Sequence, residues 1–212
     1  MTNQSALSGV VVLDLTQIMA GPFCTMVLAD MGANVIKIEK PNGGDDNRRM
    51  GPPFVGDTAA AFLMVNRNKR SLALDLKSDE GIAVFHRLVN WADVLVENLR
   101  PGALAGLGLG YEQLKERNPK LIYCSISGFG ATGPYKDRSG FDLVAQGMSG
   151  HMSFTGHPDE PPVKVSAPIT DLNAGMFAVY GILSAYIHVL RTGEGQYVDT
   201  SLIEGGIAYT MW

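Results

Sequence analysis

The stretch Val10–Glu39 decides the fold and reads VVVLDLTQIMAGPFCTMVLADMGANVIKIE. Its first six residues are mostly apolar and rich in β-branched side chains, which is typical of a buried strand. Residues 22–31 follow with a helical pattern, in which Pro22 suits the first turn and Gly32 suits the end. Residues 34–39 then alternate between polar and apolar side chains, as a second strand does. The stretch therefore predicts a βαβ unit with parallel strands and a right-handed crossover.

The rest of the chain repeats this alternation of strands and helices. Further strands are predicted over residues 71–76, 93–97, 120–127 and 196–201. Helices are predicted over 78–91, 141–147 and 170–191, with two short helices between 101 and 117, and a long loop rich in Gly and Pro over 41–57. This pattern predicts an α/β domain with a mostly parallel sheet that helices cover on both faces. Ligands in such folds bind beyond the carboxyl ends of the strands.

The composition narrows the class of protein. The 212 residues are 46% hydrophobic and 18% charged, which is ordinary for a globular protein with a core. A net charge of −4 gives no basic footprint for nucleic acid. Residues 1–8 do not form a signal peptide, and the apolar segment 177–190 is short and interrupted, so no membrane span is predicted. Cys24 and Cys124 suit buried thiols better than a disulfide or a metal site, and we expect a cytoplasmic enzyme without a metal.

The end of the chain bears on the domain organisation. The chain stops at Trp212 inside residues 202–212, an apolar stretch with the pattern of an unfinished helix and without a cap or a polar tail. We therefore expect residues 1–212 to be a truncated chain, with further residues beyond them.

The sequence lacks the common nucleotide-binding motifs but contains a basic run. After Leu15 it reads TQIMAGPFC, which is not the G-x-G-x-x-G pattern. The run Asn66–Arg70 places three cations in five residues just before a predicted strand. It is either a solvated turn or a clamp for an anion, because Arg and Lys suit phosphate by their charge and their donors. Asn98 follows the strand 93–97, in either a simple turn or a ligand-contacting loop.

Asp171 is the strongest candidate for chemistry. It stands at the start of the predicted helix 170–191. An acid there is either a cap or first-turn charge, or a covalent nucleophile, because a helix N-terminus stabilises an ionised carboxylate. Asn173 and Gly175 would leave the approach to it uncrowded.

Several short segments occur in a fixed order along the chain: LDLT at 13–16, AGP at 20–22, VIKIEKP at 35–41, NKRS at 68–71, VEN at 96–98, SGFG at 127–130 and TGEGQ at 192–196. Each is weak alone, but their order and spacing together are specific. On these segments the chain resembles the family III coenzyme A transferases from Leu7 to Trp212. Alpha-methylacyl-CoA racemase is a relative of that family.

The resemblance implies a site and a mechanism. Asp171 would be the catalytic aspartate, and backbone N–H groups at its helix start would form an oxyanion hole. Asp142 would support it, or would merely cap the helix it begins. Coenzyme A, as substrate and without a metal, would contact Ile18, Met19, Ala20, Lys40, Lys69, Arg70, Leu72, Asn98, Leu99 and Arg138.

The resemblance also implies partners. Coenzyme A would pass from an acyl-CoA donor, with succinyl-CoA as one candidate, to a carboxylic acid through aspartyl-anhydride and aspartyl-CoA thioester intermediates. Residues 1–212 would be the N-terminal part of a Rossmann-like large domain, with a smaller domain and the C-terminal part of the large domain beyond them. The fold would be part of a homodimer of two interlocked rings, with neither nucleic acid nor membrane as a partner.

Two alternatives remain open on the sequence. A racemase would require a histidine and an aspartate around the α-carbon, and that histidine would fall within residues 139–144. This chain has Phe141 before Asp142 there and no histidine, which favours transfer. The second alternative is an inactive CoA-binding paralogue, against which the presence of Asp171 counts.

Overall fold

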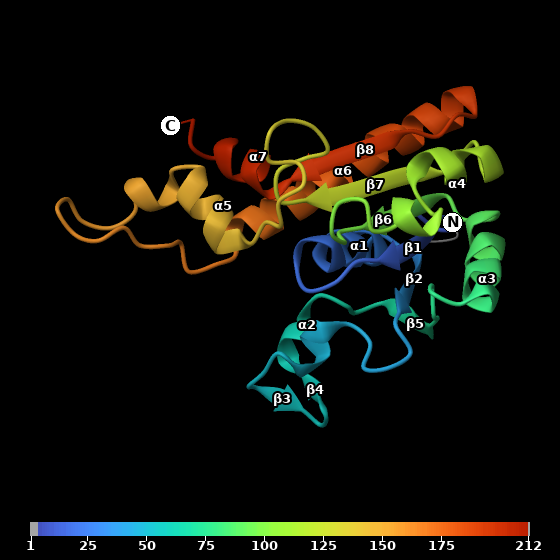
Figure 1. Cartoon of the computed structure of the whole chain (residues 1–212), viewed down its shortest axis with the longest axis horizontal. Helices are drawn as coiled ribbons and strands as arrows, with labels where there is room; N and C mark the ends of the chain where they lie inside the picture. Colours follow the sequence, from blue (N-terminus) through green and yellow to red (C-terminus); the bar gives the residue numbers. More distant parts are fainter. Residues whose placement is uncertain (1–3, 212) are drawn as a thin grey trace.

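A parallel sheet of six strands forms the centre of the computed structural model, which describes residues 4–211. The strand order is β5-β2-β1-β6-β7-β8 (Figure 1), and every neighbouring pair is parallel. The predicted α/β fold with a mostly parallel sheet is therefore confirmed. The strands are β1 (Val11–Leu15), β2 (Asn34–Glu39), β5 (Lys69–Ala73), β6 (Val94–Glu97), β7 (Ile122–Ser127) and β8 (Tyr197–Ser201).

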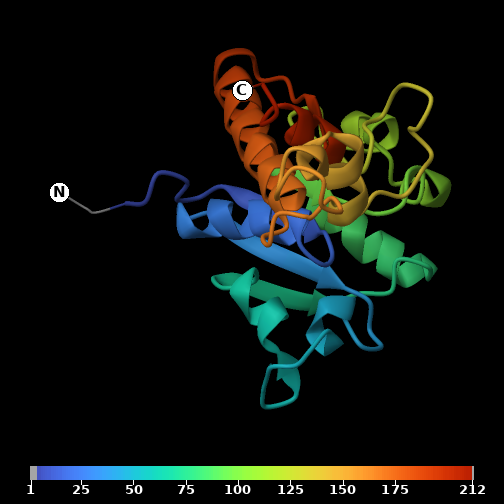
Figure 2. The ribbon, with the colours of Figure 1, turned by 90° about the vertical axis from the view of Figure 1, so that its left-hand side faces the viewer.

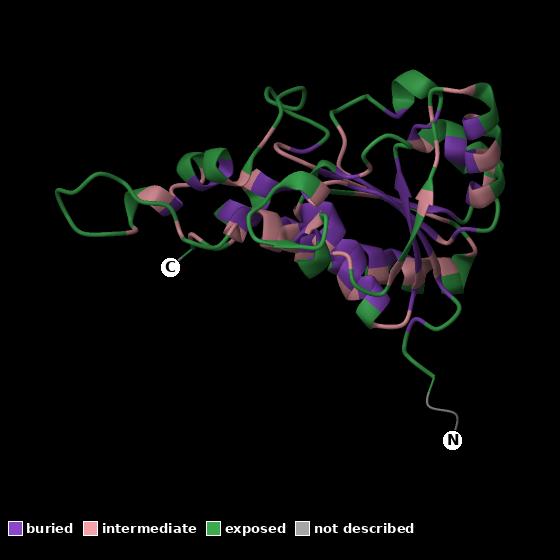
Figure 3. Cartoon of the chain, turned by 90° about the horizontal axis from the view of Figure 1, so that it is seen from below, coloured by how far each residue is buried: buried purple, intermediate pink, exposed green. Residues whose placement is uncertain are grey.

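Helices cover both faces of the sheet, because alternate strand residues point to opposite faces. The long helices α1 (Ala20–Asp30) and α6 (Ile169–Thr192) pack on one face. On the other face lie α3 (Asp79–Val89) and α4 (Tyr111–Arg117). Figure 3 shows the buried strands between these layers. The shorter helices are α2 (Ala60–Met64), α5 (Asp142–Met148) and α7 (Leu202–Ile207), with the 3-10 turns η1 (Asp46–Arg49), η2 (Ala105–Leu107) and η3 (His151–Ser153).

The strand order reverses at β1, and this reversal places the site. From β1 the chain passes through α1 to β2 on one side, whereas β6 pairs with β1 on the other side. The loops that leave the carboxyl ends of β1 and β6 therefore diverge, and a crevice opens between them.

Two predictions of local structure were wrong. Residues 41–57 are not a continuous loop, because the Asp45 side chain accepts a hydrogen bond from Asn47 N and starts η1. The same region begins an antiparallel hairpin of β3 (Phe54–Val55) and β4 (Thr58–Ala59), which projects with α2 from the β5 side of the sheet (Figure 2). The strand expected over 71–76 runs over Lys69–Ala73, because its polar first residues pair with β2.

α6 extends the apolar segment 177–190 at both ends, close to the predicted helix 170–191. By length and composition alone it could cross a membrane. One stripe of the helix, including Ala178 and Ile182, is nevertheless buried against α1 and the sheet. A helix that serves as a core layer has the same composition as a span.

Two glycines close the loop between β7 and α5. A Cβ added to Gly140 would lie 2.3 Å from the Cα of Gly128, and one added to Gly128 would lie 2.5 Å from the Cα of Gly140. Real Cβ atoms do not approach backbone so closely. The missing side chains thus let residues 138–142 return to the end of β7.

We expect Gly140→Ala to lower the free energy of unfolding by about 1–3 kcal/mol, because the new methyl group overpacks the backbone of Gly128. Gly106→Ala is the matched control, since nothing lies within 4 Å of its added Cβ, and it should change stability by less than about 0.5 kcal/mol. Urea unfolding of both variants measures the difference. Equal stability would contradict the close approach of the two glycines.

Candidate functional site

A cleft of about 430 Å³ opens at the carboxyl ends of β1, β6 and β7. The loops after these strands form its wall together with the first residues of α5 and α6. No three His, Cys, Asp or Glu side chains within residues 4–211 lie together in a way that could hold a metal. The cleft brings together the predicted site residues Ile18, Met19, Ala20, Asn98, Leu99, Arg138, Asp142 and Asp171.

Asp171 lies in the first turn of α6 and does not cap it. The helix begins at Ile169, and Pro168 is at the cap position. Burial, and then the negative charge of Asp142, raise the pKa of Asp171 from 3.8 to about 7. The helix N-terminus favours the ionised carboxylate, but the loss of water and the neighbouring like charge outweigh it and favour the neutral form.

Asp142 holds the start of α6 beside Asp171. It is the first residue of α5, but Phe141 occupies the cap position of that helix. Asp142 Oδ1 accepts hydrogen bonds from Thr170 N (2.9 Å) and Thr170 Oγ1 (2.8 Å), and its Oδ2 accepts from Gln146 Nε2 (2.6 Å). Of the two alternatives for Asp142, the cap of its own helix is excluded, since Phe141 occupies that position and Asp142 binds the first turn of the next helix.

Asn98 joins the two loops that diverge from β1 and β6. Its Oδ1 accepts from Gln17 N at 2.7 Å, and its Nδ2 donates to Gln17 O at 2.8 Å. The side chain therefore replaces a backbone pairing between the loops. This double contact joins the two loops from which Met19 and Leu99 line the cleft.

The anion clamp predicted at Asn66–Arg70 was wrong for Lys69. The run ends in the first two residues of β5 and so lies at the amino ends of the strands, whereas the cleft lies at the carboxyl ends. Lys69 Nζ is buried and donates to Asn66 Oδ1 (2.8 Å), Pro22 O (2.9 Å) and Asp14 Oδ2 (3.0 Å). These contacts use all three ammonium donors and leave none for a phosphate.

Arg70, Leu72 and Lys40 also lie outside the wall of the cleft. Arg70 Nη2 donates to Asn34 Oδ1 (2.7 Å) at the amino end of β2. Leu72 packs against the apolar core on the α3 face. Lys40 comes nearest, because its Nζ lies 2.7 Å from Asp46 Oδ1 in a solvent-exposed ion pair, and Asp46 lines the cleft.

Contrary to our expectation, Asn173 and Gly175 do not border the approach to Asp171, because neither lines the cleft. Asn173 is buried and its Nδ2 donates to Gly205 O at 3.2 Å. A Cβ on Gly175 would lie 2.7 Å from Ala20 O, so this glycine allows α6 to pack closely on the start of α1. Both residues position the helix that carries Asp171.

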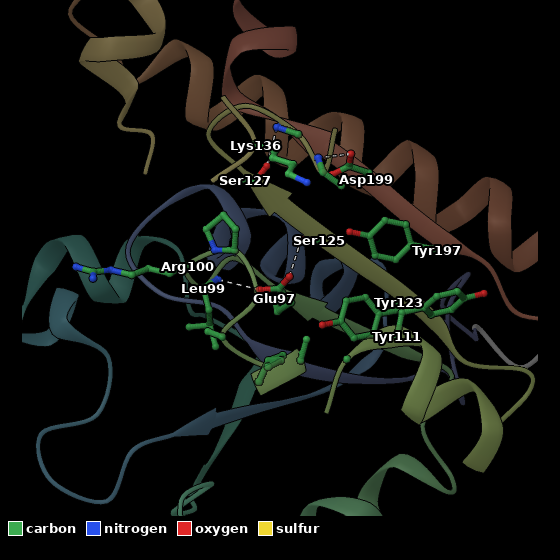
Figure 4. A pocket seen from close by; sticks show the side chains of 18 of the residues that line it. Glu97, Leu99, Arg100, Tyr111, Tyr123, Ser125, Ser127, Lys136, Tyr197 and Asp199 are labelled. Atoms are coloured by element: carbon green, nitrogen blue, oxygen red, sulfur yellow. Dashed lines mark hydrogen bonds between the residues drawn. The ribbon is translucent and has the colours of Figure 1, made fainter. Parts of the chain in front are cut away.

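A second cavity, of about 630 Å³, lies on the other side of the loop 98–101, and the sequence analysis did not predict it. Figure 4 shows Glu97 at its floor, where Glu97 Oε1 accepts from Ser125 Oγ (2.5 Å) and Oε2 accepts from Leu99 N (2.9 Å). Burial raises the pKa of Glu97. Its position at the carboxyl end of a strand was the only signal in the sequence.

The larger cavity does not contain the candidate catalytic aspartates. One wall is a cluster of the Tyr111, Tyr123 and Tyr197 rings, whose centroids lie 5.4–6.0 Å apart (Figure 4). Neither Asp171 nor Asp142 lines it. The smaller cleft is therefore the candidate active site.

The raised pKa of Asp171 predicts a pH-dependent gain in stability for Asp171→Asn. In the unfolded chain the carboxyl ionises near 3.8, but in the folded protein it ionises near 7, so wild-type stability falls as pH rises through that window. The variant has no such loss. Its Tm should exceed that of wild type at pH 8, and the difference should shrink at pH 4.

Thermal unfolding at the two pH values measures this, with the exposed Asp57→Asn as matched control. The Tm of the control should match that of wild type at both pH values. A Tm gain for Asp171→Asn that is the same at pH 4 and pH 8 would contradict the raised pKa.

Residues 7–212 match the model of the family described as CoA-transferase family III. The chain is 50% identical over 204 residues to the succinate–glutarate CoA-transferase of Agrobacterium fabrum, covering 93% of this chain and 51% of that protein. It is 46% identical over 208 residues to the succinyl-CoA:glutarate CoA-transferase of Homo sapiens, covering 98% and 48%.

Among solved structures, a CAIB/BAIF family protein from Brucella suis superimposes with a TM-score of 0.95 at 45% identity, covering 99% of this chain and 56% of that one. The chain spans about half the length of the curated relatives it matches. Because the family model covers nearly all of the sequence, this chain belongs to the CoA-transferase family III.

Proposed function

We propose that the protein transfers coenzyme A from an acyl-CoA to a carboxylic acid, with Asp171 as the covalent carrier. The position of the Asp171 carboxylate carries this proposal: it lies in the cleft at the strand ends, in the first turn of α6. Family membership supports the class of reaction. The names of the relatives support succinyl-CoA as donor and a dicarboxylic acid as acceptor.

The first half of the reaction loads the enzyme. An Asp171 carboxylate oxygen attacks the thioester carbonyl of the donor, the C–S bond breaks, and coenzyme A leaves as a thiolate. This step leaves a mixed anhydride between the donor acid and Asp171. The thiolate then attacks the aspartyl carbonyl, so that the donor acid leaves as a carboxylate and an aspartyl-CoA thioester remains.

The second half returns coenzyme A to a new acid. The acceptor carboxylate attacks the aspartyl thioester, which releases the thiolate and forms a second anhydride. The thiolate attacks the acceptor carbonyl of that anhydride, giving the new acyl-CoA and free Asp171. A carboxylate suits this role because its anhydride and its thioester are both activated.

Two of the backbone amides at the start of α6 are not available for the expected oxyanion hole. Ile169 N already donates to Ala167 O (2.8 Å), and Thr170 N donates to Asp142. These two amides are therefore engaged within the protein. We propose that their role is to fix the helix start that aims Asp171.

The cleft favours transfer over racemisation. Phe141 lines it beside Asp142, where a racemase would require a histidine, and none of the described residues lining the cleft is a histidine. Asp171 in the cleft counts against an inactive paralogue. We further propose that residues 1–212 form part of a large domain in a homodimer of interlocked rings, and that the enzyme is cytoplasmic.

Intact mass spectrometry tests the covalent carrier. The intact protein is mixed with succinyl-, acetyl-, formyl- and branched acyl-CoAs, alongside Asp171→Asn and the exposed control Asp57→Asn. We expect a hydroxylamine-sensitive adduct with at least one donor in wild type and in the control, and no adduct in Asp171→Asn. An adduct that persists in Asp171→Asn would overturn the assignment, and deuterium entering the α-carbon of a branched acyl-CoA without any adduct would favour the racemase.

The charge of Asp142 predicts the direction of a pH shift. Because Asp171 must be ionised to attack, kcat/KM for the acyl-CoA should rise with pH through about 7 in wild type. Asp142→Asn removes the like charge and should move this rise in kcat/KM, the acidic limb of the pH profile, to lower pH. The movement should be partial, since burial is the larger cause of the raised pKa. A limb that stays in place would show that Asp142 does not act on Asp171 by charge.

A further inference from the structure

Side chains, and not other backbone groups, hold the loop Thr16–Ile18 between β1 and α1. Each N–H and C=O of these three residues has a side-chain partner. Thr16 N donates to Asp14 Oδ1 (2.9 Å), and Lys37 Nζ donates to Thr16 O (2.7 Å). Gln17 is bound on both sides by Asn98. The loop therefore depends on distant parts of the chain for its conformation.

Ile18 is the strained residue of this loop. Its φ is 70°, in the left-handed region, where a β-branched residue is a rare outlier. Its side chain is 37% exposed and lines the candidate active site. Such conformations persist only when the surroundings impose them, and they concentrate at functional sites.

Asp45 and Asn47, which we call the clasp, bind the backbone of Ile18 from both sides. Asp45 Oδ1 accepts from Ile18 N at 3.2 Å, and Asn47 Nδ2 donates to Ile18 O at 2.9 Å. Asp45 Oδ1 also accepts from Asn47 N at 3.0 Å, so the two residues form one turn. Both are almost fully buried, and neither lines the cleft.

The clasp is anchored to the end of β2. Lys37 Nζ lies 3.0 Å from Asp45 Oδ2, in an ion pair whose side chains are buried. Glu39 Oε2 accepts from Asp45 N at 2.9 Å and from Arg48 Nε at 2.7 Å, and Glu39 Oε1 accepts from Arg48 Nη2 at 2.6 Å. The clasp therefore fixes the backbone of Ile18 relative to the end of β2.

We propose that Asp45 and Asn47 are positioning residues for the acyl-CoA substrate, which act by holding Ile18 in its left-handed conformation at the wall of the cleft. This inference rests on the proposed function. Ile18 directly precedes Met19 and Ala20, which line the cleft at the start of α1. A change in the Ile18 backbone would move this wall without touching Asp171.

The first test is Asn47→Ala in the intact enzyme. Loss of the amide that binds Ile18 O should let the strained residue relax. We expect the KM for the acyl-CoA to rise by roughly tenfold, which corresponds to release of part of the backbone strain at one residue. The kcat should change by less than about threefold. A crystal structure of the variant should show Ile18 with a negative φ.

The second test asks whether the effect runs through the strain. Ile18→Gly removes the penalty for a positive φ, because glycine adopts it as readily as a negative one. In the Ile18→Gly background, Asn47→Ala should therefore raise KM by much less than in the Ile18 background. An equal effect in the two backgrounds would overturn the proposal.

Asn118→Ala is the matched control. Its side-chain amide also donates to backbone carbonyls, Val89 O (2.8 Å) and Ala92 O (2.9 Å), but at the amino side of β7, away from the cleft. It should lower Tm as Asn47→Ala does and leave KM unchanged. If Asn118→Ala raises KM equally, the effect of Asn47→Ala is general destabilisation and the proposal fails.

The structural measurement separates this inference from the proposed function. If the wild-type protein forms no adduct and turns over no acyl-CoA, the proposed function is overturned. The role of Asp45 and Asn47 toward that substrate is then overturned with it. Ile18 that keeps its positive φ in Asn47→Ala would overturn the clasp even if the enzyme is an active transferase.

Discussion

Two buried lysines, Lys37 and Lys69, hold together the part of the sheet from which the cleft is built. A buried ammonium group is tolerated only when it is paired and its donors are bonded. Lys69 meets this condition through Asp14 on β1, and Lys37 meets it through Asp45 and the loop after β1. Removal of the acidic partner, Asp14 or Asp45, takes away the opposite charge that the buried ammonium group faces. The position of the loop thus follows from the pairing of charges beneath it.

The same principle gives two aspartates opposite properties. Burial alone would raise the pKa of Asp14, but Lys69 and Lys37 lower it to about 2, so this carboxylate is a fixed charge. Asp171 is desolvated and faces the like charge of Asp142, and its pKa rises to about 7. A group that titrates near neutral pH in a cleft is a candidate for catalysis, whereas a permanently charged and fully paired one is structural. The surroundings, and not the residue type, separate these two roles.

The cleft itself is assembled from segments that are distant in the sequence. The loop after β1 meets the loop after β6 through Asn98, and the return of residues 138–142 requires Gly128 and Gly140 to touch. Asp142 then joins α5 to the start of α6. Each contact is a single side chain, or a missing one, that bridges two elements. This construction makes the site sensitive to substitutions that leave the sheet intact.

The sequence by itself determined the βαβ alternation, the parallel sheet and the position of Asp171 near a helix start, because hydrophobic period and turn residues are local properties. Through a family resemblance it also named Ile18, Met19, Ala20 and Arg138, all of which line the cleft. Only the tertiary structure decided that Lys69 is a buried structural cation, that Asp142 binds the next helix, and that the turn at Asp45 and Asn47 holds Ile18. These outcomes depend on which end of the sheet a segment occupies and on which distant charge it meets. Local sequence does not encode either of these.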